Sequence, residues 1–123
     1  MKYGINLLLW TDSMHDGLVP TVEAIKKMGY DGVEMPLFDP NIELYAEWGK
    51  KLDDIGLERT AVTIRGVEDN PISPSAGVRS AAVDAMKKTI DCCHASGVKL
   101  LAGPTHSALG EFSGCGPTDD EIK

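Results

Sequence analysis

The chain has four short apolar segments, and polar side chains lie within or just after each of them. These polar residues are the candidates for catalysis or ligand binding. Asp12 and His15 follow the first segment, and Glu34 lies within the second. Arg65 follows the third segment, and His106 follows the fourth. Carboxylates and imidazoles can move protons, and together with guanidinium groups they can hydrogen-bond a polar ligand. What they do together depends on the elements that position them.

Familiar catalytic arrangements cannot be assembled from this sequence with any specificity. There is no convincing Ser/His/Asp or Cys/His set, and no CxxC or Cys/His spacing predicts a zinc site. The three cysteines include the neighbours Cys92 and Cys93, which rarely reach bridging geometry, so reduced thiols are expected. Any site must therefore be built from residues that are distant in the sequence.

A helix exit followed by a strand occurs three times along the chain. Gly29, Gly56 and Gly97 each follow an amphipathic stretch and precede a short apolar run. Glycine is favoured at the left-handed position that ends a helix, and the apolar runs have the length of buried strands. With a first strand over residues 3–9, the predicted order is β-α-β-α-β-α-β. A capping-box pattern at Thr118–Glu121 predicts the start of a fourth helix.

The three predicted helices each carry an apolar stripe at helical spacing. Proline suits the first turn of a helix, so Pro20 marks the start of the first helix, and Ser73 with Pro74 marks the start of the third. The residues expected to face the core are Val22, Ile25 and Met28 in the first helix, Tyr45, Trp48, Leu52 and Ile55 in the second, and Val78, Ala82, Met86, Ile90 and Cys93 in the third.

Regular alternation of strands and helices predicts an α/β fold with parallel strands and helices outside. Two closures fit: an open doubly wound sheet, or part of an eight-unit barrel. Leu8–Asp12 stands where a GxGxxG phosphate loop would follow the first strand, which weakens the nucleotide-binding alternative. A complete barrel takes about 250 residues, so a chain of 123 residues has the length of four units. We predict the N-terminal half of a (β/α)8 TIM barrel, a single partial domain over residues 1–123 that ends as the fourth helix begins.

The composition excludes several classes of protein. The formal net charge is -7 and the 12 Lys and Arg residues are scattered, which opposes binding to nucleic acid. No apolar run reaches the roughly 18 residues that suggest a membrane span, and the first residues lack the features of a secretory signal. A soluble, cytoplasmic protein with no nucleic-acid or membrane partner is therefore expected.

Functional residues of a TIM barrel lie at the carboxyl ends of its strands. Successive side chains of a strand point to opposite faces of the sheet. If the aliphatic residues of the first strand face the helices, Asn6 and Trp10 point into the barrel, and the same alternation points Glu34 inward on the second strand. An inward Asn6 is either a satisfied interior polar group or a donor to a ligand. An inward Glu34 is costly to bury unless it is paired or near a metal, and a salt bridge to an interior Arg or Lys is the alternative.

The three histidines differ in their expected surroundings. His106 lies in a loop after the fourth strand, where it could transfer protons or hydrogen-bond a substrate, or simply face water. His15 lies near Asp12 and Asp16, but in a polar loop where such residues are common, so metal binding there is disfavoured. His94 is expected on a helix surface.

Four segments, taken in order, resemble a single family. They are Gly4–Asn6 with Trp10, Met28–Phe38, Ile72–Pro74 with Arg79, and Ala102–Gly110. Together they resemble the sugar phosphate isomerase/epimerase family of xylose isomerase-like barrels, and especially the ketose 3-epimerases that act on tagatose, psicose (allulose) and ribulose. The resemblance runs along the whole chain.

This resemblance implies an isomerase that epimerises ketoses at C3. In such enzymes two glutamates, an aspartate and a histidine at the ends of strands five to eight hold a divalent metal (Mn, Co or Mg). The two glutamates then move the C3 proton through an enediolate. Those positions would lie beyond Lys123, so the resemblance implies no catalytic residue, metal ligand or bound cofactor in this chain, which is expected to be inactive alone.

The same resemblance assigns this half of the barrel to the sugar pocket. Asn6, Pro104, His106 and Leu109 are the expected substrate-binding residues, and Glu34 is expected to support the pocket rather than to catalyse. The expected partner is a small-molecule ketose or sugar phosphate, and the complete protein is expected to be a homo-oligomer. The alternative is a standalone half-barrel that binds a partner or self-associates through its open edges without catalysis.

Overall fold

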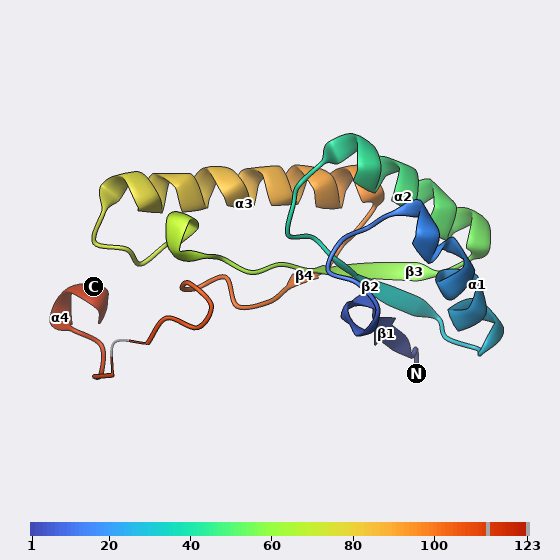
Figure 1. Ribbon diagram of the computed structural model, residues 1–123, viewed down its shortest axis with the longest axis horizontal. Coiled ribbons are helices and arrows are strands. Elements are labelled where there is room, and N and C mark those ends of the chain that lie inside the picture. The colour runs from blue at the N-terminus through green and yellow to red at the C-terminus, as the bar shows by residue number, and fades with distance from the viewer. Residues whose placement is uncertain (113, 123) are drawn as a thin grey trace. The chain divides into compact units, whose positions relative to one another are not determined.

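The computed structural model describes residues 1–112 and 114–122, apart from the side chain of Glu121. Strands and helices alternate along the chain as the sequence predicts (Figure 1). The strands are β1 (Gly4–Asn6), β2 (Gly32–Pro36), β3 (Glu58–Val62) and β4 (Leu101–Ala102). The helices are α1 (Val19–Lys27), α2 (Ile42–Ile55), α3 (Ala76–Ser96) and α4 (Asp119–Ile122), with short 3₁₀ helices η1 (Leu7–Leu9), η2 (Asp16–Leu18) and η3 (Val67–Asp69).

The four strands form one parallel sheet in the order β1-β2-β3-β4. Each strand therefore pairs with the next one in sequence, as the β/α units of a barrel do. The chain divides into two compact units. One comprises Met1–Thr63 with Lys87–Gly103, and the other comprises Ile64–Met86 with the segment from Pro104 onward. All four strands, α1 and α2 belong to the first unit.

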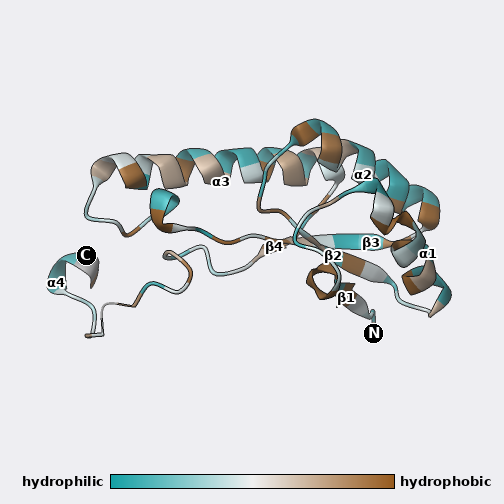
Figure 2. Cartoon of the chain, in the orientation of Figure 1, coloured by the Kyte–Doolittle hydropathy of each residue, from teal (hydrophilic) through white to brown (hydrophobic). Residues whose placement is uncertain are grey.

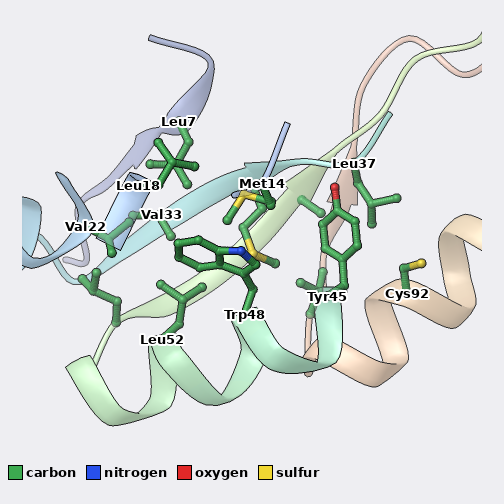
Figure 3. Packing of buried hydrophobic residues seen from close by; sticks show 14 of the residues in the cluster. Leu7, Met14, Leu18, Val22, Val33, Leu37, Tyr45, Trp48, Leu52 and Cys92 are labelled. Carbon is green, nitrogen blue, oxygen red and sulfur yellow. The ribbon is translucent and has the colours of Figure 1, made fainter. Parts of the chain in front are cut away.

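A hydrophobic core lies between one face of this sheet and its helices (Figure 3). Trp48 and Leu52 of α2 are fully buried there, together with Val33 and Met35 of β2. Tyr45 is also buried, its hydroxyl donates to the carbonyl oxygen of Pro36, and burial raises the pKa of this phenol. The stripe predicted for the second helix is thus confirmed, and the teal and brown faces of α2 in Figure 2 follow the same division.

The predicted helix exits are confirmed, because Gly29, Gly56 and Gly97 all have positive φ. Two predicted core positions are wrong: Met28 is 73% exposed and Ile90 is 53% exposed. Met28 is the C-cap residue of α1 and Ile90 lies in α3, and each side chain lines an open groove beside an end strand of the sheet. The other stripe residues of the first two helices are buried or half-buried.

Two predicted boundaries also differ from the structure. The first strand ends at Asn6, not at residue 9, because the Asn6 Oδ1 accepts a hydrogen bond from the Leu8 backbone N–H and so caps η1. Strand alternation is lost beyond that point. The third helix begins at Ala76, and the backbone N–H of Ser75 instead donates to Ser73 Oγ in a turn before it.

The cysteines occupy two kinds of environment. Cys92 and Cys93 are buried and Cys115 is exposed. Burial raises the pKa of both buried thiols, so the reactive thiolate is scarce there at neutral pH. In the described part of the chain, no helix is both long and apolar enough to cross a membrane.

We expect one thiol of the folded chain to react quickly with a thiol reagent such as DTNB at pH 8. The other two should react only as the chain unfolds, because unfolding exposes them and restores an ordinary pKa. A Cys115→Ser variant should lose the fast phase. Three equal rates in the native chain would contradict this arrangement.

Candidate functional site

A row of polar side chains crosses three neighbouring strands on the sheet face opposite the helices. The parallel register aligns Asn6 of β1 with Glu34 of β2, and Glu34 with Thr60 of β3. The Asn6 Nδ2 donates to Glu34 Oε1 at 2.6 Å, and Thr60 Oγ1 lies 3.4 Å from Glu34 Oε2. All three residues are half-buried. We call Asn6, Glu34 and Thr60 the inner polar row.

Asn6 has a fixed orientation within this row. Its amide oxygen accepts from the Leu8 N–H at 2.7 Å, while its amide nitrogen donates to Glu34. An Asn side chain has two donor hydrogens and one acceptor oxygen, so one donor hydrogen is left for a ligand. Asn6 lies on the sheet face opposite the helices, as its parity predicts, and it is a satisfied interior polar group. No described residue accepts from its second amide hydrogen, and its role as a donor to a ligand stays a prediction.

Glu34 faces away from the helix-covered core, as its parity predicts. Val33 and Met35 on either side of it are buried against the helices. Among the residues that the structure describes, Glu34 forms no ion pair, so the alternative of a salt bridge to an interior Arg or Lys is not found. Its carboxylate is instead held by the amide of Asn6 and the hydroxyl of Thr60.

The loops that follow β3 and β4 meet in the second unit. The Leu109 N–H donates to the carbonyl oxygen of Arg65 at 2.9 Å, and the Ala108 N–H lies 3.2 Å from Asn70 Oδ1. Arg65 is 4% exposed, and its guanidinium Nη1 lies 2.8 Å from Asp69 Oδ2. The same Asp69 accepts from the Gly66 N–H through its other oxygen, at 2.6 Å. An ion pair between the buried Arg65 and the half-buried Asp69 therefore shapes this pair of loops.

The five predicted pocket residues fall into two groups. Asn6 and Glu34 contact each other in the first unit. Pro104, His106 and Leu109 belong to the second unit, where Pro104 is half-buried and the other two side chains are exposed. Their roles in binding remain predictions.

Other residues singled out by the sequence lie elsewhere. Trp10 does not lie on the same sheet face as Asn6, because β1 ends at Asn6 and Trp10 lies beyond it. It is 49% exposed and lines a groove with Ile5 and residues of α1. His15 and His94 are both exposed.

A metal site needs several converging ligands, and the described residues do not provide them. Within residues 1–112 and 114–122, no group of three or more His, Cys, Asp or Glu side chains comes together. The inner polar row offers a single carboxylate. These residues do not fit a resident divalent metal, so no reaction step on this chain is derived through one.

Sequence reasoning missed two features of this region. Thr60 completes the inner polar row, and strand alternation could have found it, because the neighbouring Ala61 is buried with the helices. Arg65 and Asp69 are four residues apart in the sequence. That spacing predicts a side-chain contact in a helix, but these two residues lie in the loop between β3 and α3, where it predicts nothing. Only the folded backbone brings Asp69 back to both Arg65 and Gly66.

Replacement of Glu34 tests the inner polar row. We expect Glu34→Leu to destabilise the chain by about 1–3 kcal/mol, because the Asn6 amide would lose its acceptor in a half-buried setting. Glu34→Gln keeps an acceptor oxygen at the same place and should cost about 1 kcal/mol or less. Urea unfolding followed by far-UV circular dichroism measures both. Equal stability of the two variants would rule out the hydrogen bond as the source of the effect.

The arrangement of strands and helices matches that of known proteins. Residues 22–121 match the family model described as a xylose isomerase-like TIM barrel. The chain belongs to the xylose isomerase-like TIM barrel family. The predicted family is thereby confirmed. No curated protein sequence matches the chain at a significant level.

Several solved structures of xylose isomerase-like barrels share the fold of this chain. D-allulose 3-epimerase from Methylomonas sp., in complex with D-allulose, is 23% identical with a TM-score of 0.82, over 98% of this chain and 42% of that one. L-ribulose 3-epimerase is 22% identical with a TM-score of 0.83, over 98% and 41%. D-psicose 3-epimerase from Clostridium cellulolyticum H10, with D-tagatose, is 19% identical with a TM-score of 0.78, over 98% and 43%.

The match to these barrels confirms the predicted fold class. Four parallel strands with alternating helices correspond to the N-terminal part of a TIM barrel. The chain spans less than half the length of each of these neighbours. The inner polar row accordingly lies on the face that becomes the barrel interior in a closed member of the family.

Proposed function

We propose that this chain is the N-terminal half-barrel of a ketose 3-epimerase and that it supplies part of the sugar pocket. The observation that carries the proposal is the match of 97–98% of the chain to structures of D-allulose, D-psicose and L-ribulose 3-epimerases. One D-allulose 3-epimerase structure holds D-allulose, and two D-psicose 3-epimerase structures were determined with D-fructose or with D-tagatose. A ketose, free or phosphorylated, is the substrate class that these relatives favour.

The inner polar row is suited to contact a sugar. Sugar hydroxyls both donate and accept hydrogen bonds, and a pocket needs a small number of fixed polar groups to orient them. Asn6 is held by Glu34 and by the Leu8 N–H, so its remaining amide hydrogen has a defined direction. We assign Asn6 to a sugar oxygen and Glu34 to the positioning of Asn6.

The loop residues Pro104, His106 and Leu109 of the second unit are proposed to supply sugar contacts of their own. His106 offers an imidazole that can donate to or accept from a hydroxyl, and Leu109 offers an exposed apolar surface. Pro104 restricts the backbone where the chain leaves β4. The hydrogen bond from the Leu109 N–H to the Arg65 carbonyl oxygen holds Leu109 in the loop pair.

The reaction proposed for the complete protein is inversion at C3 of the ketose. A base removes the C3 proton from one face of the sugar, and an acid returns a proton to the other face of the enediolate. The inner polar row contains one carboxylate, Glu34, and a single carboxylate cannot perform both steps from opposite faces. The acid, the base and the ligands of the divalent metal are assigned to the part of the barrel that this chain does not match.

An activity assay of the isolated chain tests whether the catalytic groups lie outside this half of the barrel. With manganese and a panel of ketoses (D-allulose, D-fructose, D-tagatose and L-ribulose), we expect no epimer above the level in buffer. The control is the Methylomonas D-allulose 3-epimerase assayed in the same way. Formation of a C3 epimer by the isolated chain would show that this half carries the catalytic groups, which would contradict the proposal.

A further inference from the structure

Two loops of the second unit, the one after β3 and the one after β4, are held together at consecutive residues. Arg65 and Ala108 form an isolated parallel β-bridge, in which the Leu109 N–H donates to the Arg65 carbonyl oxygen at 2.9 Å. The N–H of Ala108 itself donates to Asn70 Oδ1 at 3.2 Å. The loop after β3 therefore holds two successive backbone N–H groups of the loop after β4.

The side-chain oxygen of Asn70 serves both loops. Besides the N–H of Ala108, it accepts the N–H of Ile72 in its own loop, also at 3.2 Å. An amide oxygen has two lone pairs, and these two donors use both of them. Ala108 is 2% exposed, and a buried backbone N–H without an acceptor is costly. Removal of the Asn70 oxygen would take this acceptor away at a buried position.

Asn70 is itself fixed within its loop. Its carbonyl oxygen accepts a hydrogen bond from the Ser73 N–H at 3.1 Å. The residue before it, Asp69, accepts from the Gly66 N–H at 2.6 Å and forms the ion pair with Arg65. That ion pair ties the neighbour of Asn70 to the other residue that holds the second loop. We call Arg65, Asp69 and Asn70 the loop clamp.

The loop clamp fixes the backbone from which two proposed sugar contacts project. Ala108, which the clamp holds, is buried, whereas Leu109 next to it is 59% exposed. His106, two residues before Ala108, is exposed as well. A side chain contributes more to binding when its backbone is already ordered, because ordering a loop on binding costs entropy.

We propose that Asn70 is a positioning residue of the sugar pocket. By holding Ala108 it sets the direction in which Leu109 and His106 are presented to a ketose, and it acts through the loop rather than by contact with the sugar. The inference rests on the proposed function, in which Leu109 and His106 contact the sugar.

Three variants separate loss of position from loss of stability. Asn70→Ala removes the shared acceptor, and Asn70→Asp keeps an oxygen at the same place. Asn41→Ala is the matched control, because Asn41 Oδ1 also accepts a backbone N–H, that of Leu44 at 3.0 Å, but in the first unit. Loss of this N-cap weakens α2 without removing any contact of the loop clamp.

Amide hydrogen exchange of the full chain, followed by NMR, measures the positioning. We expect Asn70→Ala to speed exchange of the Ala108 and Leu109 amides at least about tenfold, while the amides of β2 keep their rates. A purely global loss of stability would instead speed the protected amides together. Asn70→Asp should keep the slow exchange of Ala108 and Leu109, and Asn41→Ala should leave it unchanged.

Titration of the same isotopically labelled chains with D-allulose connects the loop clamp to the sugar. In the unchanged chain, the backbone amide resonances of His106 and Leu109 should shift, and so should the side-chain amide of Asn6. Asn70→Ala should reduce the shifts at His106 and Leu109 but not at Asn6, and Asn70→Asp should retain them. Glycerol at the same concentration is the control for unspecific shifts.

The two measurements fail in distinguishable ways. Unchanged exchange of Ala108 and Leu109 in Asn70→Ala, or sugar shifts that are equal in all variants, would overturn the role of Asn70 and leave the proposed function standing. Loss of slow exchange in Asn70→Asp would also overturn it. If D-allulose shifts no resonance of Asn6, His106 or Leu109 in the unchanged chain, sugar binding by this half-barrel is contradicted, and the inference is overturned with it.

Discussion

Gly103→Ala is expected to destabilise the chain by about 3–5 kcal/mol, through backbone strain and a steric clash together. Gly103 has φ of +120°, a conformation that residues with a Cβ rarely adopt. A Cβ built at this position would lie 1.9 Å from the carbonyl oxygen of Thr63. That oxygen belongs to the backbone where β3 has just ended, so it cannot move aside without disturbing the sheet at the end that carries the proposed pocket.

Gly29→Ala is the matched control for this effect. Gly29 also has positive φ, of +93°, but a Cβ there would meet no atom within 4 Å. Only the conformational cost remains, so about 1–2 kcal/mol is expected. Urea unfolding of the two variants measures the difference. If both alanines cost the same, the close approach of Gly103 to Thr63 is not a property of the folded chain.

Trp48→Ala is expected to destabilise the chain by a similar amount, about 3–5 kcal/mol. Trp48 is fully buried among the helix and sheet residues that form the core, as Figure 3 shows. Its removal leaves a large cavity that Met14, Val33 and Leu52 can fill only in part. A domain of this size has marginal stability, so a loss of this size would leave much of the chain unfolded.

Trp10→Ala supplies the comparison for Trp48. Trp10 is 49% exposed, so its truncation removes less apolar surface from the folded state and should cost about 1 kcal/mol or less in the monomer. Both variants are compared by thermal melting at a concentration where the chain is monomeric. A larger loss for Trp10 than for Trp48 would contradict the position of the core.

Periodicity in the sequence predicts the helices and their packing well. The spacing of Tyr45, Trp48 and Leu52 marks one face of a helix, and the glycines after the helices mark their ends, because both patterns reflect local backbone geometry. Met28 and Ile90 are predicted to be buried and are not. Their stripes show only that a helix has an apolar side, and what covers that side depends on the neighbouring elements.

Site residues are predicted less completely for a similar reason. Strand alternation places Asn6 and Glu34 on one face, but their hydrogen bond depends on the register between β1 and β2, which no local pattern reveals. Asn6 also ends its own strand by capping the next turn, so the prediction that Trp10 points inward fails. Side-chain hydrogen bonds to the backbone compete with strand continuation, and sequence periodicity does not report them.

Restoration of activity in a chimera tests the proposed function most directly. The chain would be joined to the part of the Methylomonas D-allulose 3-epimerase that it does not match, and the folded state of the product would be checked by a cooperative thermal transition. We expect the chimera to interconvert D-allulose and D-fructose, and Glu34→Leu in the same chimera to weaken substrate binding through the loss of support for Asn6. A chimera that melts cooperatively but forms no C3 epimer would contradict the assignment of this half-barrel to a ketose 3-epimerase.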